Sequence, residues 1–391
     1  LLLAYATRYD PCAHSHCDRG QFNLYAWREK WAIDSGYGND GKAENSATPS
    51  AAHNLVLIDG MGQGFHPELR QGTVEAEIAD FLASDPVGYT RIDQKLAYDY
   101  YVWYDLAARR DYNPVVRAYR HILFVNPGEA PGYVLFYDDI QKDAAPHRYS
   151  WLLHTSPHHE VAQDLRGFLL RPFALAGKGI WAHGPGSFRE FVAPGFSLMN
   201  NLAADLTFTF QAPAAGDYVL WALVRRAAEI SGAAKLFVNG KDCGRWNLGG
   251  LSDFCWENFT HDQDHMHRSE RIELRQGANT IRLTGLWHGF EIARLLATPN
   301  ASYVPRTGLP ADAGILIEPA DLSAQENVLV RDLAPGPDVD CRVEVLFPES
   351  CALTTDVYQP TRDPLRPRLK IEVTAVAPDF AVLLYPRKRD M

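Results

Sequence analysis

The sequence lacks the long apolar run that a membrane span needs. No stretch approaches the roughly 20 apolar residues that cross a bilayer as a helix. The opening residues Leu1–Leu2–Leu3–Ala4–Tyr5 also lack the initiator Met, the basic segment and the cleavage site of a signal peptide. We therefore expect no membrane span, and we expect the chain to begin within a longer protein or after processing.

Further absences restrict the class of function. The sequence has no Gly-rich loop that would cradle a phosphate and no Gly-x-Ser-x-Gly elbow, so nucleotide binding and serine hydrolysis have no support. The 38 Lys and Arg against 48 Asp and Glu give a formal net charge of −10 at pH 7. A general nucleic-acid-binding protein would carry a basic face instead, so we expect no nucleic-acid partner. The same charge suits a polyanionic substrate only if a local basic cleft exists.

What is abundant points to β-structure. Aromatic residues make up 12% of the 391 residues, beside 29 Gly and 25 Pro, and this composition favours short strands and turns over helical bundles. The pattern predicts an all-β fold whose largest part is an antiparallel β-sandwich. A hairpin is expected from strands at 22–27 and 31–34, with a turn at 28–30. Further strands are expected at 53–60, 73–82, 95–104, 115–125, 131–139 and 148–155.

The pattern divides the chain into four parts. The pattern predicts the large β-sandwich over residues 1–165. It predicts a connector over residues 166–195, which contain several Gly and Pro. Residues 196–305 have the order of strands and turns of a smaller β-jelly roll. Residues 306–391 return to alternating strands that complete the sandwich, so the jelly roll would interrupt one larger sheet domain.

The six Cys fall as three close pairs along the chain. Local pairing suits disulfides in an exported protein, and six unrelated thiols are the alternative. The pairs in question are Cys12 with Cys17, Cys243 with Cys255, and Cys341 with Cys351.

One group of residues carries metal-binding chemistry. His14 and His16 lie just before the strand at 22–27, and residues two apart in an extended segment project to the same side. Asp34 ends the partner strand, and His53 starts a third. Two imidazoles and a carboxylate from neighbouring strands can hold one divalent ion and leave a fourth position open. The alternative is a surface His pair with an unrelated Asp.

Several segments together resemble the heparinase II/III family of polysaccharide lyases. Residues 14–24 resemble its His-x-His-x-Asp segment that leads into a strand, and 32–37 resemble the Asp-x-Gly-Tyr element that follows. Residues 52–63 are similar to its His-Asn strand with Asp-Gly. The later segments that fit are 119–125, 133–139 and 151–155. The resemblance covers about 1–155, in order.

The resemblance implies a set of roles. It implies that His16, Asp34 and His53 hold Zn²⁺, with another divalent ion as the alternative, and that His14 faces a cleft and assists catalysis. It also implies an N-terminal (α/α) toroid, which carries further catalytic residues and which this sequence does not contain. The implied activity is β-elimination on a uronic-acid-containing polysaccharide, such as a glycosaminoglycan or alginate. The implied location is the bacterial periplasm or the outside of the cell.

The segment 196–303 resembles carbohydrate-binding modules of the jelly-roll type. Exposed aromatic side chains of such modules stack on sugar rings, although the same residues often fill the core. The candidates are Trp246, Trp256, Trp287 and Phe290. The run His261–His267 is dense in potential ligands for a second metal, but a solvated polar loop is the favoured interpretation. These features give the alternative function, a non-catalytic carbohydrate-binding protein with a structural zinc site.

Overall fold

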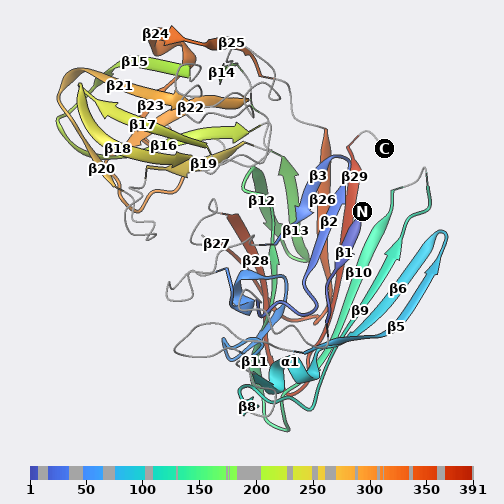
Figure 1. Ribbon diagram of the computed structural model, residues 1–391. Coiled ribbons are helices and arrows are strands. Elements are labelled where there is room, and N and C mark those ends of the chain that lie inside the picture. The colour runs from blue at the N-terminus through green and yellow to red at the C-terminus, as the bar shows by residue number, and fades with distance from the viewer. Residues whose placement is uncertain are drawn as a thin grey trace, which may run out of the picture. The chain divides into compact units, whose positions relative to one another are not determined.

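The fold is all-β in a computed structural model of the chain (Figure 1). Within the described residues, its helical elements are the short helix α1 (Lys95–Asp99) and the 3-10 turns η1 (Ser50–Ala52) and η4 (Pro319–Asp321). No helix within the described ranges is long and apolar enough to cross a membrane. The structure describes residues 1–7, 16–34, 47–64, 75–101, 109–128, 131–172, 175, 177–182, 204–226, 232–248, 254–259, 270–286, 289–305, 309–310, 312–333, 338–358 and 366–389.

The chain forms two compact units. The first contains Leu1–Pro172 and Pro337–Met391, and the second contains Phe173–Gly336. The chain leaves the first unit after strand β13 (Gly167–Pro172) and returns to it with β26 (Val339–Phe347). These two strands are hydrogen-bonded neighbours, so the second unit is inserted between adjacent strands of one sheet.

The first unit is built from antiparallel sheets. The largest has eight strands in the order β12-β13-β26-β29-β10-β9-β6-β5, and the next has four in the order β27-β28-β11-β4. Besides β13 and β26, the strands of the large sheet are β12 (His159–Asp164), β29 (Asp379–Lys388), β10 (Tyr133–Gln141), β9 (Arg117–Val125), β6 (Val87–Asp93) and β5 (Glu77–Ser84). The four-stranded sheet contains β27 (Ala352–Tyr358), β28 (Arg366–Ala375), β11 (His147–His154) and β4 (Val56–Ile58). The small sheets contain β1 (Leu2–Ala4), β2 (Phe22–Ala26) and β3 (Glu29–Ala32), and β7 (Tyr100–Tyr101) with β8 (Arg110–Asp111).

Side chains from three sheets share the core of the first unit. Buried and half-buried residues alternate along β10, as expected for a sheet with one face in the core. Phe136 of this strand stacks on Phe22 of β2, with ring centroids 3.9 Å apart, and lies 6.4 Å from Trp151 of β11. The three-stranded sheet is therefore packed into the sandwich core.

A buried ion pair lies next to this aromatic cluster. Arg120 of β9 contacts both carboxylate oxygens of Asp138 of β10, at 2.7 and 2.8 Å, and the exposed fractions of the two side chains are 0% and 3%. Arg120 Nη1 donates to the carbonyls of Gly20 and Asn54, at 2.7 and 2.6 Å. Trp151 Nε1 donates to Asp138 Oδ2 at 2.7 Å. The pair therefore ties two loop segments to the large sheet.

The second unit is a separate two-sheet structure with its own core. One sheet has the order β19-β16-β22-β14-β25, with β20 added to β16 and β23 to β22, and the other has the order β18-β17-β21-β15-β24. Its first sheet contains β19 (Cys255–Asn258), β16 (Gly216–Arg226), β22 (Phe290–Thr298), β14 (Lys178–Ala182), β25 (Val328–Asp332), β20 (Arg271–Leu274) and β23 (Ile315–Ile317). Its second contains β18 (Lys241–Leu248), β17 (Gly232–Val238), β21 (Gly277–Leu286), β15 (Ala204–Ala212) and β24 (Leu322–Glu326).

Several element boundaries differ from the sequence-based expectation. Residues 95–99 form α1 instead of the start of a strand at 95–104, and Lys95 and Asp99 pair across its one turn. The hairpin turn is Trp27–Arg28, whose φ angles of 56° and 68° fit a two-residue turn, so β3 already begins at Glu29. Residues 167–172 form strand β13 of the large sheet rather than part of a connector. Strands β24 and β25 belong to the second unit, although we expected residues 306–391 to complete the sandwich.

The disulfide interpretation is wrong for all three Cys pairs, because Cys17 of the first pair is a free thiol and so are both members of the other two pairs. Cys243, Cys255, Cys341 and Cys351 are free thiols. The members of each of these two pairs come from different sheets: Cys243 is in β18 and Cys255 in β19, while Cys341 is in β26 and Cys351 precedes β27. Closeness in sequence therefore does not bring their sulfur atoms together. Cys12, the expected partner of Cys17, lies outside the described residues.

We predict that Arg120→Met lowers the free energy of unfolding by about 3–5 kcal/mol, because it leaves the Asp138 carboxylate buried without its counter-charge. Arg117→Met is the matched control, since Arg117 pairs with Asp139 across the same two strands but both side chains are about a third exposed. That change should cost roughly 1 kcal/mol or less. Urea unfolding measures both. Equal losses for the two variants would contradict the role given to the buried pair.

Candidate metal centre

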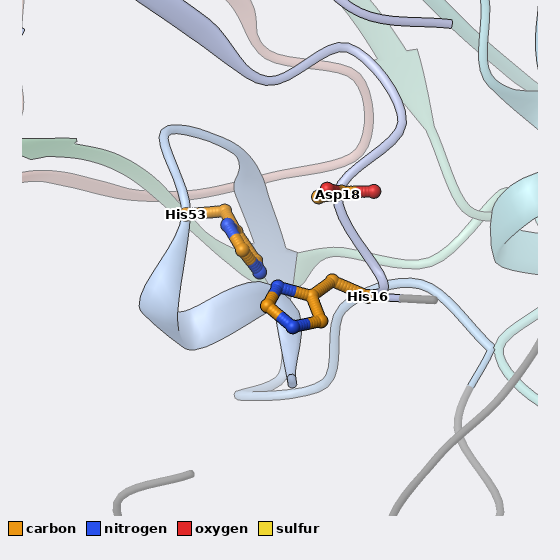
Figure 2. A group of neighbouring side chains, drawn as sticks. All are labelled: His16, Asp18 and His53. Atoms are coloured by element: carbon orange, nitrogen blue, oxygen red, sulfur yellow. The ribbon is translucent and has the colours of Figure 1, made fainter. Parts of the chain in front are cut away.

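Two buried imidazoles face each other at one end of the sandwich. His16 lies in the segment before β2, and His53 directly follows η1. His16 is 9% exposed and His53 is fully buried, with ring centroids 5.4 Å apart. Figure 2 shows a ring nitrogen of His53 directed toward the ring of His16. The pair of rings expected from the sequence is therefore present.

Two carboxylates border these rings. Asp18 forms a group with His16 and His53 in which one ligand atom of each residue lies within 4.8 Å of the others. Asp34 Oδ1 lies 2.6 Å from His53 Nδ1, and the Asp34 side chain is 32% exposed. Asp18 is 15% exposed and contacts Arg19 Nη1 at 2.6 Å. Sequence reasoning named Asp34 and missed Asp18, although Asp18 stands two residues after His16 and would share its side of an extended segment.

Charge and burial act against each other in this group. Burial raises the pKa of the Asp18 carboxyl, while the charges of His53 and Arg19 lower it by smaller amounts. Burial also opposes protonation of His53, but the Asp34 carboxylate, the Asp18 carboxylate and the Ala47 backbone together outweigh it and raise the pKa of the ring. The site is therefore one where a buried cation is favoured by two neighbouring carboxylates.

Asn54 holds the strand ends around the site. Its backbone N–H donates to Gln21 Oε1 at 2.5 Å, and its side-chain amide donates to the carbonyls of Phe22 and Ile33, at 2.8 and 3.1 Å. Its Oδ1 accepts from the backbone N–H of His154 at 2.6 Å. One side chain thus joins the start of β2, the end of β3 and the end of β11, and it fixes the position of the adjacent His53.

A second network fixes the segment that carries His16. The backbone N–H of Cys17 donates to the carbonyl of Thr48 at 2.9 Å, and its thiol donates to the carbonyl of Gly64 at 3.0 Å. Ser50 Oγ donates to the carbonyl of Cys17 at 2.7 Å. Gln63 bonds both backbone groups of Arg19, at 2.9 and 2.6 Å. These contacts leave His16 little freedom to move away from His53.

The remaining candidates from the sequence have different outcomes. His14, Trp287 and the run His261–His267 lie outside the described residues. Trp246 is fully buried against Phe259 and donates through Nε1 to the carbonyl of Asn258 at 2.8 Å. Trp256 and Phe290 are 8% and 3% exposed. The exposed-platform interpretation is therefore corrected for these three residues, because they fill the interior of the second unit.

Another ligand cluster was not anticipated from the sequence. Glu29, His158 and His159 bring one ligand atom each within 4.8 Å of the others, and all three residues are buried. Contacts to His158 and His159 lower the pKa of the Glu29 carboxyl to about 2 although burial opposes this, and burial lowers the pKa of His159 to about 4. The adjacent His residues were a weak signal, because Glu29 lies 129 residues away from His158.

Buried imidazoles beside carboxylates, on a sandwich of antiparallel sheets, define a candidate metal centre in an all-β protein. Residues 3–195 match the family model described as "Heparinase II/III-like, C-terminal". This part of the chain therefore belongs to the heparinase II/III-like family, a family of polysaccharide lyases. No curated protein matches the sequence.

Solved structures with similar chains are distant in sequence. The heparan sulfate lyase HepC from Pedobacter heparinus is 9% identical with a TM-score of 0.43, and the match covers 100% of this chain and 33% of that one. A heparinase III, the BT4657 gene product, is 10% identical with a TM-score of 0.31, covering 85% and 39%. A family 35 carbohydrate-binding module from an environmental isolate is 16% identical with a TM-score of 0.20, covering 27% and 72%. The chain spans about a third of the length of HepC.

The residues present suit a zinc ion. His53 Nε2 is a buried atom with no hydrogen-bond partner among the described residues, which leaves an imidazole nitrogen available for a metal. Zn²⁺ prefers imidazole nitrogen and carboxylate oxygen at about 2.0–2.2 Å. The Asp34 carboxylate, which now contacts His53 Nδ1 at 2.6 Å, is a nearby oxygen donor of the kind that zinc accepts.

We predict that Asn54→Ala destabilises the first unit by roughly 1–3 kcal/mol for each buried group left without a partner, chiefly the Ile33 carbonyl and the His154 N–H. Asn126→Ala is the control, because Asn126 is exposed, and it should change stability by about 0.5 kcal/mol or less. Thermal unfolding followed by circular dichroism measures both. An unaltered melting temperature for Asn54→Ala would contradict the organising role of this residue.

Proposed function

We propose that this chain is the metal-binding β-sandwich part of a lyase that cleaves a uronic-acid-containing polysaccharide by β-elimination. The observation that carries the proposal is the buried pair His16 and His53, which faces two carboxylates within a segment of the heparinase II/III-like family. The names of the heparan sulfate lyase and the heparinase III support a sulfated glycosaminoglycan as the substrate class.

The proposed ligands of the zinc ion are His16, His53 and Asp34. Of the two nearby carboxylates, Asp34 is the more exposed, and it already contacts the ring of His53. Asp18 is paired with the guanidinium of Arg19, whose positive charge disfavours a second cation on the same oxygen atoms. Asp34 would exchange its hydrogen bond with His53 for a bond to the ion. When bound, the ion supplies a fixed positive charge that holds the surrounding loops together.

The proposed catalytic residue is His14, the role that the resemblance to the heparinase II/III family implies for it. Removal of the C5 proton of a uronate requires a neutralised carboxylate, a base, and an acid that protonates the leaving glycosidic oxygen. His14 precedes His16 by two residues, and His16 is held by the contacts of Cys17 and Ser50 described above. We propose that His14 acts as the base or as a donor to the substrate carboxylate. The other catalytic groups are expected from the toroid that the family resemblance implies.

The alternative, a carbohydrate-binding protein without catalysis, has less support. It depended on exposed aromatic platforms in the second unit, and three of the four candidate side chains are buried. We therefore keep the lyase as the proposed function.

Metal analysis of purified variants tests the ligand set. We predict that His16→Ala and Asp34→Asn each lose the zinc ion of this site, whereas Asp18→Asn retains it. Inductively coupled plasma mass spectrometry after dialysis against a zinc buffer gives the content per chain. Retention of this zinc by Asp34→Asn together with its loss from Asp18→Asn would transfer the carboxylate role to Asp18.

An activity assay tests the reaction. The full-length protein that carries this chain should raise the ultraviolet absorbance of heparan sulfate or another uronate, because β-elimination creates a carbon–carbon double bond. His14→Ala should lower kcat by roughly 10²–10⁴-fold while the zinc content stays constant, since it removes a proton-transfer group. The lyase proposal fails if no uronate gives a signal with the folded, zinc-loaded protein.

A further inference from the structure

We propose that Glu29, His158 and His159 form a second site for a divalent transition-metal ion, Zn²⁺ by its ligand set. This proposal does not depend on the lyase function. Both imidazoles converge on one oxygen atom, with His158 Nε2 at 2.7 Å and His159 Nε2 at 3.2 Å from Glu29 Oε2. Two imidazoles and one carboxylate are a ligand combination typical of zinc.

The local backbone explains how adjacent residues reach one point. Neighbouring residues in a strand point to opposite sides, so two consecutive His side chains would ordinarily diverge. Here the backbone N–H of His159 donates to the carbonyl of Ser156 at 3.0 Å and closes a turn at the entry of β12. His158 lies in this turn, His159 begins the strand, and their ring centroids are 4.5 Å apart. The turn therefore converts a diverging pair into a converging one.

The second nitrogen of each ring has a hydroxyl partner. Ser156 Oγ lies 2.6 Å from His158 Nδ1, and Thr155 Oγ1 lies 2.6 Å from His159 Nδ1. A hydroxyl can donate to or accept from an imidazole nitrogen. Each neutral ring can thus adopt the tautomer that carries its proton on Nδ1. The Nδ1–H then donates a hydrogen bond to the hydroxyl oxygen, and the lone pair of Nε2 is available for the metal. This is the arrangement that orients His ligands in zinc proteins.

Burial and packing give the site the rigidity that a metal centre needs. The side chains of Glu29, His158 and His159 are 6%, 9% and 0% exposed. Trp31 of β3 stacks on the His159 ring at 4.8 Å between centroids, with an interplanar angle of 23°. Ligand atoms around a tetrahedral zinc ion lie about 3.3 Å apart for bonds of about 2.0 Å. Glu29 Oε2 and the two Nε2 atoms, now 2.7 and 3.2 Å from it, would therefore separate by less than about 1 Å to admit the ion.

The position in the fold indicates what the ion would do. Glu29 begins β3 of the three-stranded sheet, and His159 begins β12 at the edge of the eight-stranded sheet. A bound ion would cross-link these two sheets. Asp34 follows the other end of β3, so the same strand would connect the second site to the His16 and His53 pair.

Zinc content in a His16→Ala background tests this proposal. That variant removes a ligand of the first site, and we expect one zinc ion per chain to remain after equilibration in a zinc buffer. Glu29→Gln in the same background should remove the remaining ion, since a neutral amide replaces the anionic ligand. Ser156→Ala leaves all three ligands in place and should weaken zinc binding about 10–100-fold by releasing the His158 ring.

The matched control is His147→Ala in the same background. His147 also contacts two carboxylates, but its Nδ1 contacts Asp59 and its Nε2 contacts Asp143. Since these nitrogens lie on different sides of the ring, the two carboxylates cannot bind one ion together with His147. This change should leave the zinc content unaltered. A folded His16→Ala chain without zinc would overturn the second site, and so would one whose zinc survives Glu29→Gln. Circular dichroism establishes folding in each case, and replacement by Co²⁺ should show the visible absorption of a four-coordinate site.

Discussion

The first unit depends on the buried ion pair of Arg120 and Asp138. A buried charge is tolerated only when a counter-charge and hydrogen bonds replace the lost water. Here the hydrogen bonds that replace water are made by Trp151 to Asp138 and by Arg120 to the carbonyls of Gly20 and Asn54. These three partners belong to separate parts of the chain. Because the Arg120 guanidinium needs hydrogen-bond acceptors, its bonds to these carbonyls hold the loops before β2 and after η1 on the large sheet. Those loops carry the imidazoles of the candidate metal centre.

The metal centre extends this arrangement toward the surface. Asn54 links the ends of β2, β3 and β11, and its neighbour His53 lies where these ends meet. Asp34 approaches His53 from the end of β3, and the contacts of Cys17 position His16 beside the His53 ring. The three proposed zinc ligands are therefore placed by hydrogen bonds of residues next to them in sequence. A zinc ion would strengthen an arrangement that the polar core already establishes.

Local pattern predicted much of this from the sequence, and long-range geometry did not. The strands β9, β10 and β11 were predicted from their strand-like segments and spacing. His16 and His53 were named as zinc ligands because residues 14–24 and 52–63 resemble heparinase II/III elements, since their spacing alone left a surface His pair as the alternative. The helix at Lys95–Asp99 was missed because a single turn has no periodicity to detect. The Cys pairs and the aromatic platforms failed because closeness in sequence and residue type do not determine which sheet or which face a side chain occupies. The group of Glu29 with His158 depends on a contact across 129 residues, which a single sequence does not encode locally.

Anomalous diffraction at the zinc edge, from a crystal of the zinc-loaded chain, tests the central claim most directly. The account predicts a peak within about 2.0–2.2 Å of a ring nitrogen of His16, a ring nitrogen of His53 and a carboxylate oxygen of Asp34. An ordered site without a peak between the two rings, in crystals grown with zinc in excess, would contradict it.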